Sequence, residues 1–483
     1  MNDILVKTVD RYPVNLSVQT ILRFFVVLLP TLSYIFYQLP ELSVVDFTFI
    51  VLLVQSVILL CFVGGRQLTL LNVYFVFSIM FFCVAPWLQY ANKVVLWSPK
   101  DFSNADYIIT NYIIFMSNIV VFLSYFVVFR RRWSGGLFKK LARKVDADTN
   151  QSCLLPSLLI LLSVVSLYFL FYLNNFSIMS VFFKGFVEDE LGPIIESSSL
   201  LMIADKLVRL IPFFSFLYSY NQTKSRPLIN LILFVLLLIC AFPTGISRYM
   251  VAFIYIPILL LLFPRLFRGF TFSYILIGSI IFIFPFLNQF RDISRLEKIS
   301  ILPSPDMFFS GHFDAYQNLM QVIQLNLVTY GNQILGVALF FVPRAVWDNK
   351  AIGSGHYLSE VGGLSFNNIS MPLLGEGYIN FGILGVIAFS IAAGVVMGVL
   401  DKVFDDTRFK TNSRYLYSVY LYFCGALTFV LRGDLLSSFA YVMSGIVSAV
   451  LVVFLAKMVK AVFPYSHIRL FSSNRNVFSS VRK

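Results

Sequence analysis

Long apolar runs separated by short polar segments dominate the sequence. Many of these runs hold roughly 18 to 24 residues, the length of α-helix that crosses the hydrocarbon core of a bilayer. Read between charges, Pro, Gly and Asn, the runs predict twelve transmembrane helices. The first run is too long for the core of a signal peptide and no small-residue cleavage site follows it, so we expect it to remain as an anchor. The predicted helices span 18–38, 46–64, 69–88, 107–129, 154–173, 203–221, 228–244, 247–263, 271–288, 377–400, 415–431 and 435–457.

Composition agrees with a membrane protein and excludes a soluble one. Hydrophobic residues make up 58% of the 483 residues and charged residues 13%, about half of the usual share. We therefore expect an all-α polytopic membrane protein surrounded by lipid bilayer. The net charge of +13 would suggest nucleic acid in a soluble protein, but here the cations mark one side of the membrane, and no nucleic-acid partner is expected. The five Cys lie in or beside apolar runs, so no disulfide framework is predicted.

The cations gather on one side of the predicted helices. With the N-terminus inside, the inner segments hold 24 of the 37 Lys and Arg residues but only 7 of the 24 Asp and Glu residues. Cytoplasmic segments next to transmembrane helices carry an excess of Lys and Arg. This bias therefore predicts that both termini are cytoplasmic.

One connection is much longer than the others. A segment of about 85 residues, 288–374, joins the ninth and tenth predicted helices on the outer side, and loops of that length are usually functional. Residues 313–324 have the apolar spacing of an amphipathic helix, which could lie on the bilayer or on the helix bundle, and residues 334–342 could re-enter the membrane. The chain thus divides into a nine-helix bundle at 1–287, a large outer loop at 288–376, three further helices at 377–457 and a basic inner tail at 458–483.

Cations are rare on the predicted outer side, so those that occur there are candidates for function. Arginine presents a planar, permanently charged set of donors that fits phosphate oxygens, such as those of a lipid pyrophosphate. Each cation could instead pair with a neighbour, as Arg432 could with Asp434, or extend to the lipid headgroups. The outer cations that we take as candidates are Arg248, Arg291, Arg295, Arg344, Lys350 and Arg432.

Acid–base chemistry is suggested by a second group in the outer loop. His356 follows Gly353-Ser-Gly and could act as a general acid or base near neutral pH, unless it is a plain loop histidine. Glu376 lies at the start of the tenth predicted helix, where it could be a catalytic carboxylate or only a capping charge. Gly311-His312-Phe-Asp314 offers a further histidine and carboxylate. An acidic cluster at 188–190 lacks His and Cys, and no metal site is expected.

The sequence around these residues resembles the O-antigen polymerase (Wzy-type) family. The resemblance is carried by Arg344-Ala-Val-Trp followed by Lys350, by Asn367-Asn-Ile-Ser-Met-Pro, and by Gly375-Glu-Gly-Tyr-Ile-Asn-Phe-Gly382. It implies a polytopic (GT-C-like) glycosyltransferase of the bacterial inner membrane with its active site on the periplasmic face. The implied substrates are two undecaprenyl-pyrophosphate-linked oligosaccharides, and the implied partner is a chain-length regulator protein. No cofactor is implied, and a metal-independent mechanism is expected.

The resemblance also implies roles for individual residues. Cations would stabilise the departing pyrophosphate, Arg248, Arg291 and Arg344 first, and Arg295, Lys350 and Arg432 second. The base for the attacking hydroxyl would be His356 or Glu376, with Asp314 also open. Further residues expected to bind substrate are Asp314, Tyr378 and Asn380.

Two other functions share this topology. An O-antigen ligase would use the same lipid-linked donor and differ in its acceptor. A flippase or other transporter of lipid-linked oligosaccharides would place ionisable residues along its path inside the spans. Few charges lie inside the predicted spans, and Arg23, Asp205, Lys206 and Arg209 lie near helix ends, which favours the polymerase.

Overall fold

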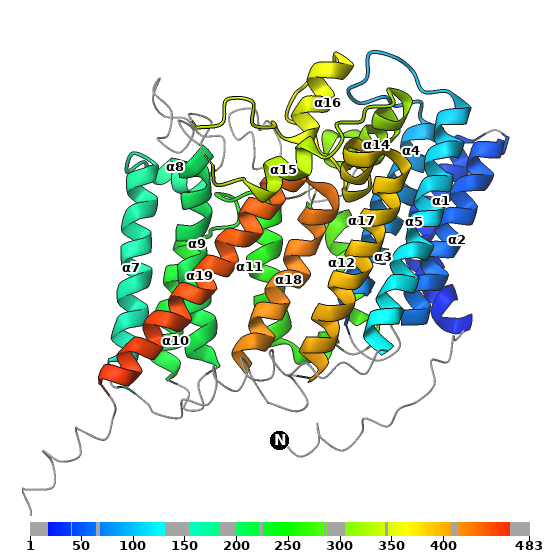
Figure 1. Ribbon diagram of the computed structural model, residues 1–483. Helices are drawn as coiled ribbons and strands as arrows, with labels where there is room; N and C mark the ends of the chain where they lie inside the picture. The colour runs from blue at the N-terminus through cyan, green and yellow to red at the C-terminus, as the bar shows by residue number, and fades with distance from the viewer. Residues whose placement is uncertain are drawn as a thin grey trace, which may run out of the picture.

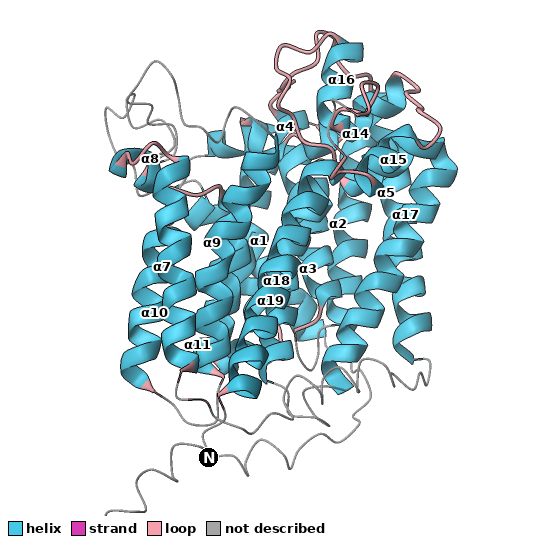
Figure 2. Cartoon of the chain, turned by 60° about the vertical axis from the view of Figure 1, so that its left-hand side comes forward, coloured by secondary structure: helices cyan, strands magenta, loops and turns pink. Residues whose placement is uncertain are grey.

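The computed structural model describes residues 18–39, 41–63, 68–130, 152, 154–183, 199–221, 226–267, 269–284, 286, 305–342, 346–406 and 414–463. Every regular element within these ranges is a helix (Figures 1 and 2), which confirms the predicted all-α class. The long helices are α1 (Val18–Gln38), α2 (Val44–Val63), α5 (Asn104–Arg130), α7 (Leu155–Leu173), α9 (Ser199–Tyr220), α10 (Pro227–Cys240), α11 (Arg248–Leu262), α17 (Leu373–Asp406), α18 (Arg414–Arg432) and α19 (Leu435–Val462). The shorter elements are α3 (Leu70–Phe77), η1 (Ser78–Val84), α4 (Ala85–Ala91), α8 (Ile178–Phe182), η3 (Pro264–Phe267), α12 (Thr271–Gly278), η4 (Ser279–Ile283), η6 (Pro305–Phe309), η7 (Gly311–Phe313), α14 (Ala315–Gln324), α15 (Asn332–Ala338) and α16 (Ser354–Gly362).

The helices form two bundles, each with its own apolar core. One core contains side chains of α1 to α5, α12 and α17, and the other contains side chains of α7, α9, α10, α11 and α19. The two bundles stand side by side in Figure 1. α18 belongs to both, since Leu421 and Cys424 lie in the first core while Tyr415, Tyr422 and Ala426 lie in the second. Opposite apolar faces of α18 thus join the two halves.

Each of the twelve predicted apolar runs coincides with a helix, if α3–α4 and α12–η4 count as one run each. Among the described residues, seven helices are long and apolar enough to cross a membrane, namely α1, α2, α3–α4, α5, α7, α17 and α19. Four shorter ones are also apolar: α10, α11, α12–η4 and α18. The remaining helix, α9, carries the charged residues Asp205, Lys206 and Arg209. A helical membrane protein is confirmed, while twelve spans and a GT-C-like arrangement stay predictions.

The segment formed by α3, η1 and α4 is buried in the first bundle from Leu70 to Gln89. Its polar side chains find partners on neighbouring helices, as a polar group in an apolar core must. Asn118 of α5 accepts a hydrogen bond from the Tyr74 hydroxyl at 2.9 Å and donates one to Ser78 Oγ at 3.2 Å. The π-helical turn η1 ends just before Pro86, which supplies no N–H to the helix ladder.

Residues 305–342 and 346–372 form a layer, here called the cap, over one end of the bundles (Figures 1 and 2). α14 is the helix predicted by the spacing of residues 313–324. It packs on α5 and α17 rather than on the bilayer, so that even Gln317 and Asn318 are buried. Gln317 Nε2 donates to Gln89 Oε1 at 2.9 Å, and Asn318 Nδ2 donates to the Ser370 carbonyl at 2.7 Å.

α17 is broken near its cap end. It begins at Leu373, before the predicted start at 377, and Phe381 (φ −145°, ψ 24°) and Gly382 (φ 62°, ψ −147°) depart from helical geometry. The part before the break folds back against the part after it. Gly377 and Gly385 are in such close contact that a Cβ on Gly385 would lie 1.9 Å from the Gly377 carbonyl oxygen.

The cap satisfies the backbone groups that this break leaves without helical partners. Thr329 N donates to the Ile379 carbonyl at 2.7 Å, and Gly331 N donates to the Asn380 carbonyl at 3.0 Å. The Asn380 side chain accepts from Ile334 N, in the first turn of α15, at 2.9 Å. The broken helix therefore holds α15 in place.

Candidate functional site

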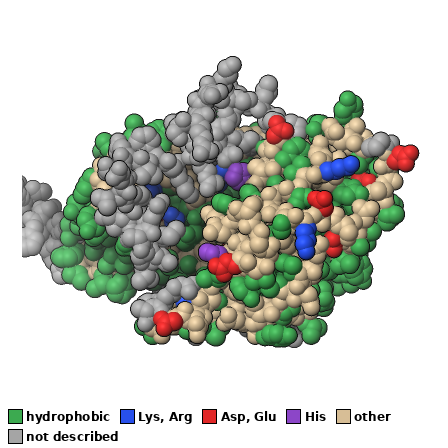
Figure 3. All heavy atoms as spheres, turned by 90° about the horizontal axis from the view of Figure 1, so that it is seen from above, with side chains coloured by type: hydrophobic (Ala, Val, Ile, Leu, Met, Phe, Trp, Pro, Cys, Tyr) green, Lys and Arg blue, Asp and Glu red, His purple; other side chains and the backbone are tan. Residues whose placement is uncertain are grey.

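The face of the molecule at the cap end is hollowed (Figure 3). Basic side chains lie in the hollow, histidine side chains lie at its edge, and apolar side chains form much of the surrounding surface. α9, α11 and α19 begin at this end and α18 ends there (Figure 1). Residues of these helices and of the cap are therefore the candidates for function.

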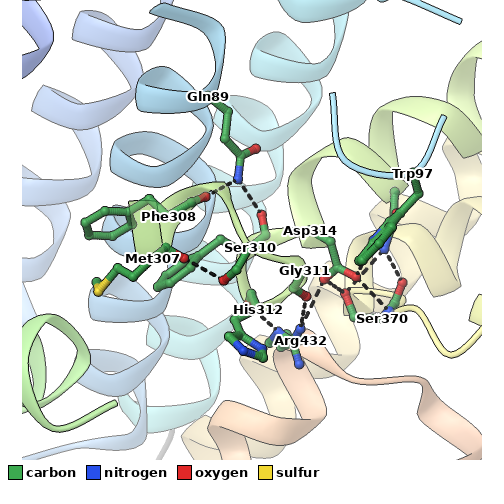
Figure 4. A network of polar contacts seen from close by, with 12 residues as sticks. Gln89, Trp97, Met307, Phe308, Ser310, Gly311, His312, Asp314, Ser370 and Arg432 are labelled. Carbon is green, nitrogen blue, oxygen red and sulfur yellow. Dashed lines mark hydrogen bonds and ion pairs between the residues drawn. The ribbon is translucent and has the colours of Figure 1, made fainter. Parts of the chain in front are cut away.

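Arg432, the last residue of α18, clamps the cap segment 311–314 (Figure 4). Its Nε donates to the His312 carbonyl at 2.8 Å, and its Nη2 donates to the Gly311 carbonyl at 2.8 Å. Nη2 also forms an ion pair with Asp314 Oδ1 at 3.1 Å. The ion-pair partner of Arg432 is thus in the cap, not at the neighbouring Asp434.

Asp314 is buried and surrounded by donors. Its Oδ1 accepts from Ser370 Oγ at 2.5 Å, and its Oδ2 accepts from Trp97 Nε1 at 3.1 Å and from Ser370 N at 3.2 Å. These contacts join the cap to the loop after α4 (Figure 4). The donors around Asp314, together with Arg432, hold the segment that contains His312, two residues before Asp314. The predicted part of Asp314 in substrate binding stays a prediction.

Arg248 and His312 lie on the same aromatic ring. The Arg248 guanidinium carbon is 4.5 Å from the centroid of the Phe284 ring, a cation–π contact. The His312 ring meets Phe284 edge-on, with centroids 5.4 Å apart. α11, the cap and Phe284, which directly follows η4, thus bring together a guanidinium and an imidazole from positions far apart in the sequence.

α9 carries a charged group that sequence reasoning set aside as lying near a helix end. Asp205 accepts from Lys206 Nζ at 2.5 Å and from Arg209 Nε at 2.8 Å. The Lys206 ammonium also lies 5.7 Å from the centroid of the Tyr441 ring. The sequence contained a signal for this group, because charges clustered in an apolar run of a membrane protein usually mark a functional site.

Glu376 and Asp434 accept hydrogen bonds from backbone N–H groups at the N-termini of α19 and α16. Glu376 Oε1 accepts from Leu435 N, the first residue of α19, at 2.9 Å, and its Oε2 accepts from Ser354 Oγ at 2.8 Å. Asp434 accepts from Ser437 N at 3.0 Å and from Gly355 N of α16 at 3.3 Å. Burial raises the pKa of the Asp434 carboxyl, and its backbone hydrogen bonds oppose that rise. Asp434 had been considered only as a partner of Arg432.

His356 lies on α16, which projects from the cap (Figure 1). Its Nε2 is 3.1 Å from Glu360 Oε1, one turn further along the helix, and both side chains are about half exposed. Glu376 instead contacts Ser354, at the start of the same helix. The two predicted bases therefore lie near one helix end, but each has a different hydrogen-bond partner.

Three other predicted substrate-binding residues hold the scaffold together. Lys350 Nζ donates to the Phe340 carbonyl at 2.6 Å, and the Tyr378 hydroxyl donates to Asn326 Oδ1 at 3.1 Å. Asn380 uses its oxygen for α15, as described, and its Nδ2 for the Glu376 carbonyl at 2.8 Å. Roles for these residues in substrate binding stay predictions.

Arg291, Arg295 and Arg344 lie outside the described residues. The predicted roles of these three arginines therefore stay predictions too. No group of three or more His, Cys, Asp or Glu that could hold a metal ion occurs among the residues that the structure describes.

Comparison with known proteins found no matching family model, curated protein or solved structure.

Proposed function

We propose that the chain is a membrane glycosyltransferase that polymerises undecaprenyl-pyrophosphate-linked oligosaccharide repeat units into O-antigen or a related surface polysaccharide. The observation that carries the proposal is the meeting of Arg248 and His312 on the Phe284 ring, beside the Arg432–Asp314 ion pair. A permanent cation and a titratable base side by side, at one end of a membrane bundle, suit a reaction with an anionic leaving group on a lipid.

The proposed reaction needs a cation and a base in defined places. A hydroxyl oxygen of the acceptor sugar forms a bond to the anomeric carbon of the donor chain, and the bond from that carbon to the pyrophosphate oxygen breaks. The proton of the hydroxyl passes to the base, while lipid pyrophosphate leaves with the bonding electrons. Donors placed where this negative charge develops lower the barrier most.

Arg248 is proposed to take up that charge, with Arg291 and Arg344 as the partners that the sequence resemblance suggests. His312 joins His356 as a proposed base. The two oxygens of Asp314 and of Glu376 already accept hydrogen bonds from within the protein, which leaves these carboxylates less available to a substrate. His312 is favoured over His356 because it lies next to Arg248.

The proposal also covers the location of the reaction, the orientation of the chain, and its cofactors and partners. The reaction is placed at the periplasmic face of the bacterial inner membrane, with both termini in the cytoplasm, without cofactor or metal, and with a chain-length regulator as partner. The distribution of 24 of the 37 cations in the predicted inner segments supports this orientation.

The test is lipopolysaccharide from a deletion strain that carries each variant, separated as a ladder of chain lengths. Arg248→Ala and His312→Ala should each collapse the ladder to one repeat unit. Losing one donor to a developing charge costs about 10²–10³ in rate, and losing a general base costs about 10²–10⁴. Arg130→Ala is the matched control. Arg130 stacks on Phe126 at the other end of α5 and should give a normal ladder. Normal ladders from Arg248→Ala and His312→Ala, at equal protein level, would rule out this site.

A transporter of lipid-linked oligosaccharides is the second candidate, favoured by the charges that α9 places inside the second bundle. The same gel separates the candidates. Loss of a polymerase leaves one repeat unit on the lipid core, whereas loss of a flippase, or of an O-antigen ligase, leaves none.

A further inference from the structure

Among the described residues, Lys206 and Arg209 share one carboxylate, that of Asp205, and so carry one positive charge more than it neutralises. Two cations share the single carboxylate of Asp205, at 2.5 Å and 2.8 Å. Charges buried among helices are costly unless they are paired or used. One cation would suffice to neutralise Asp205, so the second calls for another explanation.

Arg209 is the structural member of the pair. Besides Asp205 Oδ1, it donates from Nη1 to the carbonyl of Cys240, the last residue of α10, at 2.8 Å. Its side chain is only 5% exposed. Arg209 therefore neutralises Asp205 and ties α9 to the end of α10.

Lys206 is the member that reaches the surface. Its side chain is 16% exposed, compared with 3% for Asp205. The ammonium lies toward Tyr441 of α19, whose ring is nearly parallel to that of Tyr249, with centroids 5.5 Å apart. Tyr249 directly follows Arg248 in the first turn of α11, so the contacts through Tyr441 place Lys206 near the start of α11. Basic side chains are visible in the hollow at this end (Figure 3).

An ammonium has three donors, and one of them serves Asp205. Within the described part of the chain, the charge that Asp205 does not neutralise and the remaining donors of Lys206 fit an anion with several oxygens. We propose that Lys206, held by Asp205 and backed by Arg209, binds a phosphate group presented at the membrane interface. The phosphate would belong either to the lipid-linked substrate, in which case the inference rests on the proposed function, or to an anionic lipid headgroup.

The test measures ligand binding to the purified full-length chain. Two probes distinguish the sources of phosphate: farnesyl diphosphate, a short prenyl diphosphate, added to protein in nanodiscs of phosphatidylcholine, and phosphatidylglycerol introduced into the nanodiscs in place of phosphatidylcholine. Lys206→Met keeps the length and apolar stem but loses the charge. It should weaken binding of the relevant probe about ten- to hundredfold, the effect of losing one charged hydrogen bond. Lys206→Arg keeps the charge and should retain most of the affinity.

Lys402→Met is the matched control. Lys402 Nζ lies near the Val128 and Phe129 carbonyls, at the opposite end of the bundle, and its loss should leave binding of both probes unchanged. A weaker affinity for farnesyl diphosphate alone identifies the substrate as the source, and a weaker affinity for phosphatidylglycerol alone identifies the headgroup.

Unchanged affinity of Lys206→Met for both probes would overturn the inference, whether or not its melting temperature falls, since a lower melting temperature alone means that Lys206 is structural. This failure differs from failure of the proposed function, which is read from the ladders of Arg248→Ala and His312→Ala. A collapsed ladder in those variants, together with normal binding by Lys206→Met, would reject only the phosphate-binding site at α9 and would leave the proposed function standing.

Discussion

At the scale of single residues, three buried carboxylates of the described residues accept hydrogen bonds from helix N-termini and have no cation as ion-pair partner in the structure. Asp401 of α17 accepts from Leu70 N, the first residue of α3, at 3.0 Å. Glu376 does the same for α19, and Asp434 for α16. The first N–H groups of a helix have no partner within it and carry partial positive charge, so a carboxylate there is stabilised without a cation. Asp314 is different, because it has Arg432 as its ion-pair partner, as Asp205 has Lys206 and Arg209.

This difference predicts a strong effect at Arg432. Arg432→Ala removes two donors to the cap backbone and leaves Asp314 buried without its counter-charge. Losing one member of a buried pair costs about 3 kcal/mol or more, so thermal unfolding in detergent should shift to clearly lower temperature. Asp314→Asn combined with Arg432→Ala should recover part of the loss, since no buried charge then remains unpaired. A melting temperature of Arg432→Ala equal to wild type would show that the clamp contributes nothing to stability.

At the scale of elements, the positions of the helices were readable and their irregularities were not. Apolar runs located every long helix, because span length and burial both depend on local sequence. The break in α17 was not predicted, because an apolar run through Phe381 and Gly382 reads as continuous helix. It is held open by hydrogen bonds from Thr329 and Gly331, residues far away in sequence. The charges of α9 were noticed but not assigned, since their partners on α10 and α19 become visible only after folding.

The break makes a specific prediction for Gly382. Its φ of 62° and ψ of −147° form a conformation that residues with a Cβ rarely adopt. The space around it is open, because the nearest atom to an added Cβ would be Val328 Cγ2, at 3.9 Å. Alanine at this position would therefore be strained in its backbone conformation, while its methyl group would not clash with neighbouring atoms. Gly382→Ala should lower stability by about 1–3 kcal/mol, measured as the midpoint of thermal unfolding.

Gly278→Ala is the control for that measurement. Gly278 has helical φ and ψ at the end of α12, and nothing lies within 4 Å of an added Cβ. Alanine is favoured over glycine in a helix by about 1 kcal/mol, so this variant should be neutral or slightly more stable. Equal midpoints for the two variants would mean that α17 is not broken at Gly382 in the membrane.

At the scale of the whole molecule, the arrangement of the two bundles puts the cap and the candidate site at one end. α18 fixes the bundles to each other through both of its faces, and Arg432 at its last turn fixes the cap. The site residues come from α9, α11, the end of η4, α18 and the cap, and so depend on both bundles. No single segment of sequence could have shown this, although the predicted outer location of Arg248 and Arg432 already placed two of its members at one end.

The orientation of this end in the membrane can be measured by cysteine labelling. The four described native cysteines, Cys61, Cys83, Cys240 and Cys424, are buried and should not react, and Cys153 is replaced by Ser. Val361 on α16 is 51% exposed, and Phe463, at the opposite end of the molecule after α19, is 53% exposed. Because the excess of Lys and Arg marks the cytoplasmic side, Val361→Cys should react with a membrane-impermeant maleimide in intact cells. Phe463→Cys should react only after the inner membrane is opened. The reverse pattern would place the cap in the cytoplasm, where periplasmic glycan assembly cannot occur, and would exclude the proposed polymerase together with its site.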